Sequence, residues 1–172
     1  LSILFGDISG SVPLAEKMSP EDAADLINEC LKVMVDAILK YEGSINRYIG
    51  DCVLAFFGAP TAHENDPERA ILAALEMRDA VTKLNLNIKI GINTGMVYVG
   101  AMGPDSHREF AAMGSAVNLA SRLQGAAQRP GQILVGESTY RLTRRSFEFQ
   151  PMPPLTLKGI DKPVSAYEVL KA

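Results

Sequence analysis

The stretch from Ile45 to Gly58 constrains the fold more than any other part of this 172-residue chain. It contains two runs of β-prone residues, Ile45–Ile49 and Cys52–Phe57, which are separated only by Gly50 and Asp51. A two-residue loop that begins with Gly supplies the positive φ that tight turns require, so the stretch predicts a β-hairpin. We expect the turn to lift the carboxylate of Asp51 clear of both strands.

A second acidic residue, Asp7, ends the first apolar run of the chain, Ser2–Ile8, which predicts a buried strand. Two carboxylates at strand ends, beside a turn that contains glycine, suit a site for hard cations and phosphate. Taken alone, Asp51 is equally well interpreted as an ordinary turn residue. The remaining motifs decide between the two interpretations.

The apolar periodicity of the remaining chain indicates an α+β fold. It predicts helices at Ser19–Tyr41, Asp66–Val81, Ser115–Ala127 and Glu137–Leu142. Further strands are expected at Leu86–Ile92, at Met96–Val99 after a reversing turn, and at Ile133–Val135, Phe147–Phe149, Leu155–Leu157 and Ala166–Leu170. Strands outnumber helices and do not alternate with them regularly. We therefore expect a mostly antiparallel sheet with the helices packed on one face.

Composition limits the classes of function. With 47% hydrophobic and 22% charged residues, residues 1–172 are expected to form one soluble globular domain. A net charge of −3 argues against nucleic-acid binding. Two distant cysteines, Cys30 and Cys52, match neither a disulfide framework nor a metal motif, which favours a reducing, cytoplasmic compartment. Because the chain starts without Met and has no signal peptide or membrane segment, it is interpreted as a catalytic or regulatory domain of a longer protein.

Three other features suit phosphate chemistry. Asn118 and Arg122 are four residues apart in a predicted helix, so an amide and a guanidinium share one face. Backbone N–H groups at Gly10 and Ser11 follow the first acidic residue and are placed to cradle phosphates. Lys158 lies between a strand and a turn. Each feature alone has a simpler interpretation, as a surface pair, an ordinary loop and a solvated charge.

Together, these segments resemble the catalytic domain of the class III adenylate/guanylate cyclases, of the bacterial type, over essentially the whole chain. The resemblance is carried, in order, by Phe5–Gly10, Gly50–Phe56, Val117–Leu123, Leu157–Gly159 and Tyr167–Val169. Each motif is moderately specific, and their order and spacing make the match strong. The resemblance implies a ferredoxin-like core.

The resemblance also implies a metal site and a reaction. Asp7 and Asp51, with the backbone carbonyl of Ile8, would hold two Mg²⁺ or Mn²⁺ ions. The ribose 3′-hydroxyl of ATP would attack the α-phosphate, and 3′,5′-cyclic AMP and pyrophosphate would form. The other implied site residues are Asn118 for the ribose, Arg122 for charge at the α-phosphate, and Lys158, Ser9, Gly10, Ser11 and Val12 for the triphosphate.

In this family the aspartates come from one subunit, and the Asn, Arg and Lys come from the other. This chain carries both sets, which implies a head-to-tail homodimer with two equivalent sites and an inactive monomer. Regulatory domains of the parent chain are expected partners.

The chain departs from the family pattern where the base is recognised. Arg47 stands where the family usually has Lys, and Ala111 stands where it has Asp or Thr. Ser11 and Val12 replace the usual Phe and Thr. Arg47 keeps the donor character of Lys, which favours ATP, but Ala111 has no side-chain acceptor. Two alternatives therefore stay open: a cyclase that uses GTP or both nucleotides, and a catalytically degenerate domain that dimerises and regulates.

Overall fold

The computed structural model describes residues 1–9, 16–104 and 109–172, and the side chains of these residues except those of 99–102 and 109–113. Its helices are α2 (Pro20–Lys40), α3 (Asp66–Lys83), α4 (Ser115–Ala126) and α5 (Glu137–Thr143). Its strands are β1 (Ser2–Ser9), β2 (Ser44–Ile49), β3 (Cys52–Phe57), β4 (Asn87–Thr94), β5 (Tyr98–Met102), β6 (Glu109–Met113), β7 (Ile133–Gly136), β8 (Glu148–Pro151) and β9 (Ala166–Lys171). Each helix overlaps the range predicted for it. Among the described helices, none has both the length and the apolar character needed to cross a bilayer.

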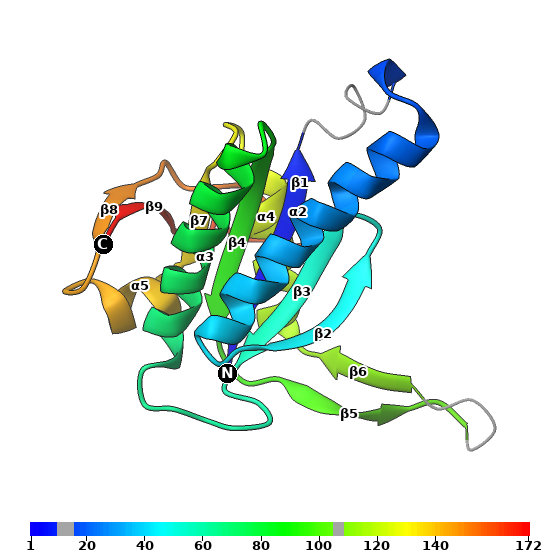
Figure 1. Ribbon diagram of the computed structural model, residues 1–172. Coiled ribbons are helices and arrows are strands. Elements are labelled where there is room, and N and C mark those ends of the chain that lie inside the picture. Colours follow the sequence, from blue (N-terminus) through cyan, green and yellow to red (C-terminus); the bar gives the residue numbers. More distant parts are fainter. Residues whose placement is uncertain (10–15, 105–108) are drawn as a thin grey trace.

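The main sheet has seven strands in the order β2-β3-β1-β4-β7-β9-β8 (Figure 1). β1 lies between β3 and β4 and is antiparallel to both, and the β4–β7 pair is parallel. The segment from β1 to β4, with α2 and α3, has the βαββαβ connectivity of ferredoxin-like folds. The predicted α+β class and mostly antiparallel sheet are therefore confirmed.

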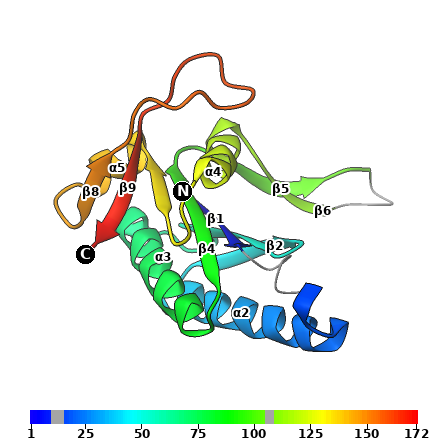
Figure 2. The same cartoon turned by 90° about the horizontal axis from the view of Figure 1, so that it is seen from above.

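Helices cover both faces of the sheet, which corrects one detail of the prediction. Along β1, Leu4 and Ile8 belong to the core beneath α2 and α3, whereas Ile3 and Phe5 point to the opposite face and meet α4. α2 and α3 cover the first face, and α4 covers the second (Figure 2). α5 packs against the same core as α2 and α3 through Tyr140. Because β1 is apolar on both faces, neither face of the sheet centre can be left in water. The second layer consists of α4.

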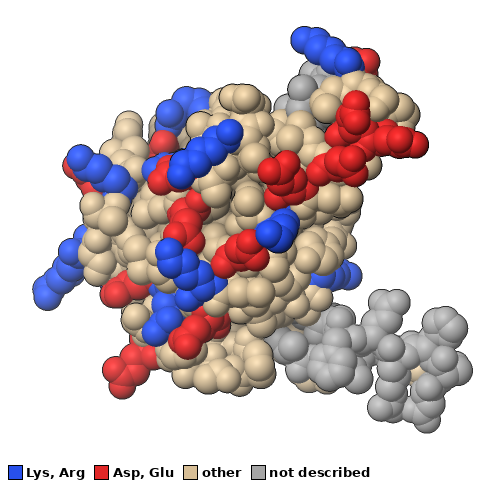
Figure 3. All heavy atoms as spheres, in the orientation of Figure 1, with Lys and Arg blue, Asp and Glu red and all other residues tan. Residues whose placement is uncertain are grey.

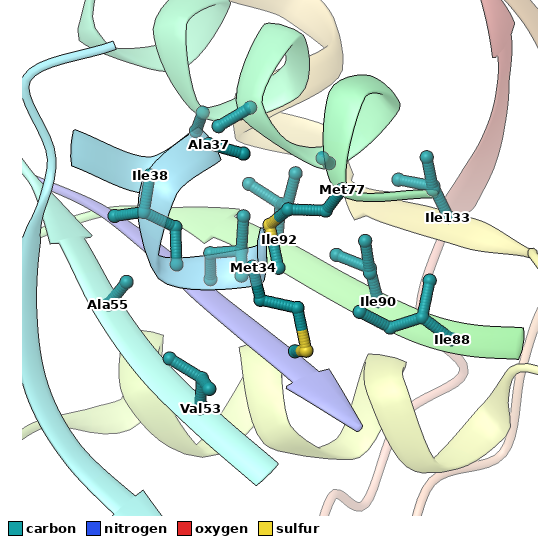
Figure 4. Packing of buried hydrophobic residues seen from close by; sticks show 14 of the residues in the cluster. Met34, Ala37, Ile38, Val53, Ala55, Met77, Ile88, Ile90, Ile92 and Ile133 are labelled. Carbon is teal, nitrogen blue, oxygen red and sulfur yellow. The ribbon is translucent and has the colours of Figure 1, made fainter. Parts of the chain in front are cut away.

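The larger core lies between α2, α3 and the sheet (Figure 4). Side chains from the two helices pack against side chains of the sheet. The labelled residues of this core are Met34, Ala37, Ile38, Met77, Val53, Ala55, Ile88, Ile90, Ile92 and Ile133. α2 begins as predicted: the Ser19 hydroxyl accepts a hydrogen bond from the Asp22 N–H at 3.1 Å, and Pro20 occupies the first turn. The two helices thus pack against the face of β1 that bears Leu4 and Ile8.

Local turn chemistry explains the hairpin, and strand pairing explains where the prediction fails. Gly50 has φ 63°, and β2 pairs with β3 as expected. The strand predicted at Met96–Val99 does not turn back onto β4, because β4 is already paired with β1 on one side and β7 on the other. Instead, β5 pairs with β6 in a separate ribbon. The segment near Leu155 forms only one isolated bridge, to Val164, beside prolines that cannot donate to a ladder.

The surface over α2 is acidic. Figure 3 shows red side chains along this helix, and its exposed acidic residues are Glu21, Asp22, Asp25, Glu29 and Asp36. This face would repel a polyphosphate. The residues predicted to bind phosphate on α4 lie on the other side of the sheet.

Candidate active site

The two predicted metal-binding carboxylates lie side by side at one end of β1. Asp7 is half-buried, faces the α4 side of the sheet, and lies opposite Cys52 on β3 and Lys89 on β4. Asp51 follows Gly50 in the hairpin turn, and its backbone carbonyl accepts a 3.4 Å hydrogen bond from the Ile8 N–H. That bond fixes the turn over the end of β1. The carboxyl groups of Asp7 and Asp51 lie close enough to share a hydrogen bond when one of them is protonated.

The local electrostatics make this pair costly without a cation. Burial, the hydrogen bond to Asp51 and the charge of Asp51 raise the pKa of Asp7 from 3.8 to about 6, whereas Gln124 and Lys89 act in the opposite direction. Burial and the charges of the same two aspartates raise the pKa of Cys52 to about 12. Cys52 is therefore a neutral thiol at physiological pH. The carboxylates are the groups that attract a cation.

The residues present fit a hard divalent cation. In the described part of the chain there is no group of three or more His, Cys, Asp or Glu side chains placed to hold a metal. Two carboxylates with few other protein ligands suit Mg²⁺ or Mn²⁺, which keep waters and bind substrate phosphates. Ile8 lies between Asp7 and Ser9 on β1, and the role of its carbonyl stays a prediction.

The segment that follows β1 carries the predicted phosphate cradle. Ser9 ends β1, and its buried hydroxyl has no hydrogen-bond partner within the described residues. A buried hydroxyl of this kind has free capacity for a ligand. Gly10, Ser11 and Val12 lie outside the described residues, so their assignment to the triphosphate remains a prediction.

Asn118 and Arg122 are exposed on α4, as their spacing predicted. Arg122 and Lys158 line one cavity of about 280 Å³, so the structure brings together two cations that are far apart in sequence. Asn118 lines a neighbouring cavity of about 520 Å³ together with Gly159, whose φ of 80° forms the turn after Lys158. Two cations in one hollow suit a phosphate chain.

The acidic and the cationic sets are separated in one chain. Neither Asp7 nor Asp51 lines the cavity of Arg122 and Lys158 or the cavity of Asn118. Within one chain, the two acidic candidates therefore lie apart from the cavities that the cationic and amide candidates line.

The two predicted base-reading residues lie in different sheets. Arg47 is exposed on β2, opposite Leu54 and next to a β-bulge. Ala111 lies on β6, opposite Gly100 of β5, and its side chain is outside the described set. The structure does not bring these two residues together within one chain, and their roles stay predictions.

Sequence reasoning missed two residues that contact or face Asp7. Gln124 donates from Nε2 to Asp7 Oδ2 over 3.4 Å, and Lys89 lies beside Asp7 across the β1–β4 pair. Lys89 stands at a polar position of an alternating strand, so its pattern indicated only exposure. Finding either residue requires the strand register and the position of α4.

The helix that carries Asn118 and Arg122 touches the sheet at Gly91. A Cβ at Gly91 would lie 2.4 Å from the backbone oxygen of Ala120 and 2.4 Å from the backbone nitrogen of Gln124. These are backbone atoms, so the whole helix would have to move. Gly91 therefore sets the distance between α4 and β4.

We expect Gly91→Ala to lower the free energy of unfolding by about 2 kcal/mol or more, because it overpacks the α4–β4 contact. Gly125→Ala is the matched control on the same helix: a Cβ there meets nothing within 4 Å. It should be neutral or raise helix stability by roughly 0.5–1 kcal/mol. Urea unfolding of both variants tests this. A Gly91→Ala domain as stable as wild type would contradict the close contact.

The raised pKa of Asp7 predicts a pH effect on the metal-free domain. Between 3.8 and about 6 the folded chain keeps a proton that the unfolded chain has lost. This contribution to stability is complete below 3.8 and is lost as pH rises through about 6. In EDTA, the Tm of wild type should therefore fall relative to that of Asp7→Asn between roughly pH 4 and pH 6. A Tm difference that is constant across this range would contradict the prediction, and saturating Mn²⁺ should reduce it.

The fold described above is that of a class III nucleotidyl cyclase catalytic domain. The family model described as "Adenylate and Guanylate cyclase catalytic domain" matches residues 1–171. The chain therefore belongs to the family of adenylate and guanylate cyclase catalytic domains.

Known relatives include enzymes named for either nucleotide. The chain is 32% identical to an adenylate cyclase of Anabaena cylindrica, over 98% of this chain and 36% of that protein. Among solved structures, the adenylyl cyclase CyaB from P. aeruginosa superimposes with a TM-score of 0.94 at 34% identity, over 99% of this chain and 93% of that one. The guanylate cyclase domain of RhGC from Catenaria anguillulae, solved with GTP, gives 0.89 at 26% identity, over 99% and 95%. The chain thus spans about a third of the length of the Anabaena protein.

Proposed function

We propose that this domain converts ATP to 3′,5′-cyclic AMP and pyrophosphate at two equivalent sites, each formed by two copies of the chain. The observation that carries the proposal is the separation of the Asp7–Asp51 pair from the cavity of Arg122 and Lys158. A head-to-tail pair of copies brings one chain's acidic half to the other chain's cationic half. The similarity to CyaB and to the Anabaena enzyme supports this assignment.

Each half would contribute different chemistry. Asp7 and Asp51 would hold two Mg²⁺ or Mn²⁺ ions, which when bound lower the pKa of the ribose 3′-hydroxyl and neutralise phosphate charge. Lys158 and the buried hydroxyl of Ser9 would bind the triphosphate, and Asn118 would orient the ribose.

The reaction is an in-line displacement on the α-phosphate. The 3′-oxygen forms a bond to the α-phosphorus, its proton passes to solvent, and the bond between the α-phosphorus and the oxygen bridging to the β-phosphate breaks. Pyrophosphate leaves with that oxygen. Arg122 lies on α4, and its guanidinium would stabilise the negative charge that grows on the α-phosphate oxygens.

The preference for ATP rests on Arg47, which is exposed on β2 and keeps the donor character of the usual Lys. Ala111 has no side-chain acceptor for the base. Its presence should therefore reduce the discrimination between ATP and GTP more than it reduces the rate of the reaction. A cyclase that uses GTP or both nucleotides is therefore the second candidate. The observation that favours it is that Arg and Ala occupy positions 47 and 111, where the base is recognised.

The test is cyclic nucleotide production by the purified domain with Mn²⁺, on ATP and GTP separately, over a range of protein concentrations. Specific activity that rises with concentration and favours ATP would support the proposal. Equal use of both nucleotides would favour the second candidate. If a folded dimer makes neither product, the domain is a regulatory, degenerate member of the family.

A further inference from the structure

Helix α4 presents polar side chains in two directions. Asn118 and Arg122 are exposed on its outer face. Gln124, only two residues after Arg122, is half-buried and turns back into its own chain, where Nε2 donates to Oδ2 of Asp7 over 3.4 Å. This is a long hydrogen bond, and it joins the helix of the cationic half to the metal-binding carboxylate of the acidic half.

Packing fixes Gln124 in this place. Its backbone nitrogen lies 2.4 Å from the position that a Cβ on Gly91 would take, so the helix backbone packs directly on β4. Ala120 and Leu123 are fully buried beneath the same turn. The turn of α4 that contains Gln124 is therefore closely packed against the sheet.

A neutral amide suits the position beside Asp7. Among the described residues, the other groups beside this carboxyl are Asp51, Lys89 and the neutral thiol of Cys52. A second lysine or an arginine in place of Gln124 would compete with a divalent cation, and a third carboxylate would add repulsion. The amide N–H instead engages one oxygen of Asp7 and adds no charge, which leaves the other oxygen oriented for a metal.

We propose that Gln124 is a positioning residue for Asp7, and that it serves the site built on its own chain's aspartates while Arg122 of the same helix serves the opposite site. The assignment of Gln124 and Arg122 to opposite sites is the second half of this inference, and it rests on the proposed function. The first half, that Gln124 supports Asp7 for metal binding, concerns only contacts within one chain. The two halves can be tested separately.

Binding of Mn²⁺ alone, followed by electron paramagnetic resonance, tests the first half. Gln124→Met keeps the size of the side chain but removes the donor, and it should weaken Mn²⁺ binding by about tenfold, as loss of a group that supports a metal ligand does. Gln128→Met is the matched control, because Gln128 is exposed just beyond the end of α4. Equal Mn²⁺ affinity in both variants, with both folded, would overturn the inference.

Mixed dimers test the second half. When one chain carries Arg122→Ala and its partner carries Asp51→Asn, only one site is complete, and its aspartates come from the Arg122→Ala chain. Gln124→Met on that chain should raise the half-saturating Mn²⁺ concentration of turnover by about tenfold. The same change on the Asp51→Asn chain should leave it unchanged, because its Gln124 faces the inactive site.

The outcomes separate the two proposals. An equal effect of Gln124→Met on both chains would mean that the change merely disturbs α4, and would overturn the positioning role. No activity from any mixed dimer would instead refute the shared site of the proposed function. In that case the Mn²⁺ affinities still decide whether Gln124 supports Asp7.

Discussion

Asp51→Asn should lower cyclase activity by more than about 100-fold, since loss of a group that only supports a metal ligand already costs about 10- to 100-fold. The change is nearly isosteric, and it removes one of two carboxylates that raise each other's energy at the end of β1. The metal-free domain should therefore be as stable as wild type or more stable. Turnover at saturating Mn²⁺ and thermal unfolding in EDTA measure the two effects.

The combination of these effects is what identifies a metal-binding role. A residue that merely shaped the hairpin turn would lose stability together with activity when replaced. The substitution Gly50→Ala provides that comparison, because the φ of 63° at Gly50 disfavours a side chain and the change should destabilise the turn. Activity of Asp51→Asn within tenfold of wild type would contradict the assignment of this carboxylate.

Two inactive variants should restore activity when they are combined. Arg122→Ala and Asp51→Asn remove opposite halves of the proposed site, so each homodimer has two broken sites. A mixed dimer has one site with both defects and one intact site. Random pairing should therefore recover about a quarter of wild-type activity per total protein.

Refolding or co-expression of the two variants, followed by assay of cyclic AMP, checks this expectation. Mixing Asp51→Asn with Asp7→Asn is the control and should recover nothing, because both changes affect the same half. Recovery in the control, or none in the complementing pair despite verified mixed dimers, would contradict a site shared across two chains.

The sequence by itself determined the local elements and the family. Gly50 permits the tight turn, Ser19 and Pro20 start α2, and the four-residue spacing of Asn118 and Arg122 places both on one helical face. These features depend on residues close in sequence, whose geometry is set by backbone sterics and helical periodicity. They were sufficient to predict the class of fold and the resemblance to the cyclases.

Only the tertiary structure decided how distant segments meet. α4 covers the second face of the sheet, and β5 pairs with β6 because β4 has no free edge. The cavity shared by Arg122 and Lys158 and the contact between Gln124 and Asp7 depend on these arrangements. Such contacts arise from burying whole faces and pairing whole strands, and no local pattern in the sequence encodes which faces and edges remain free.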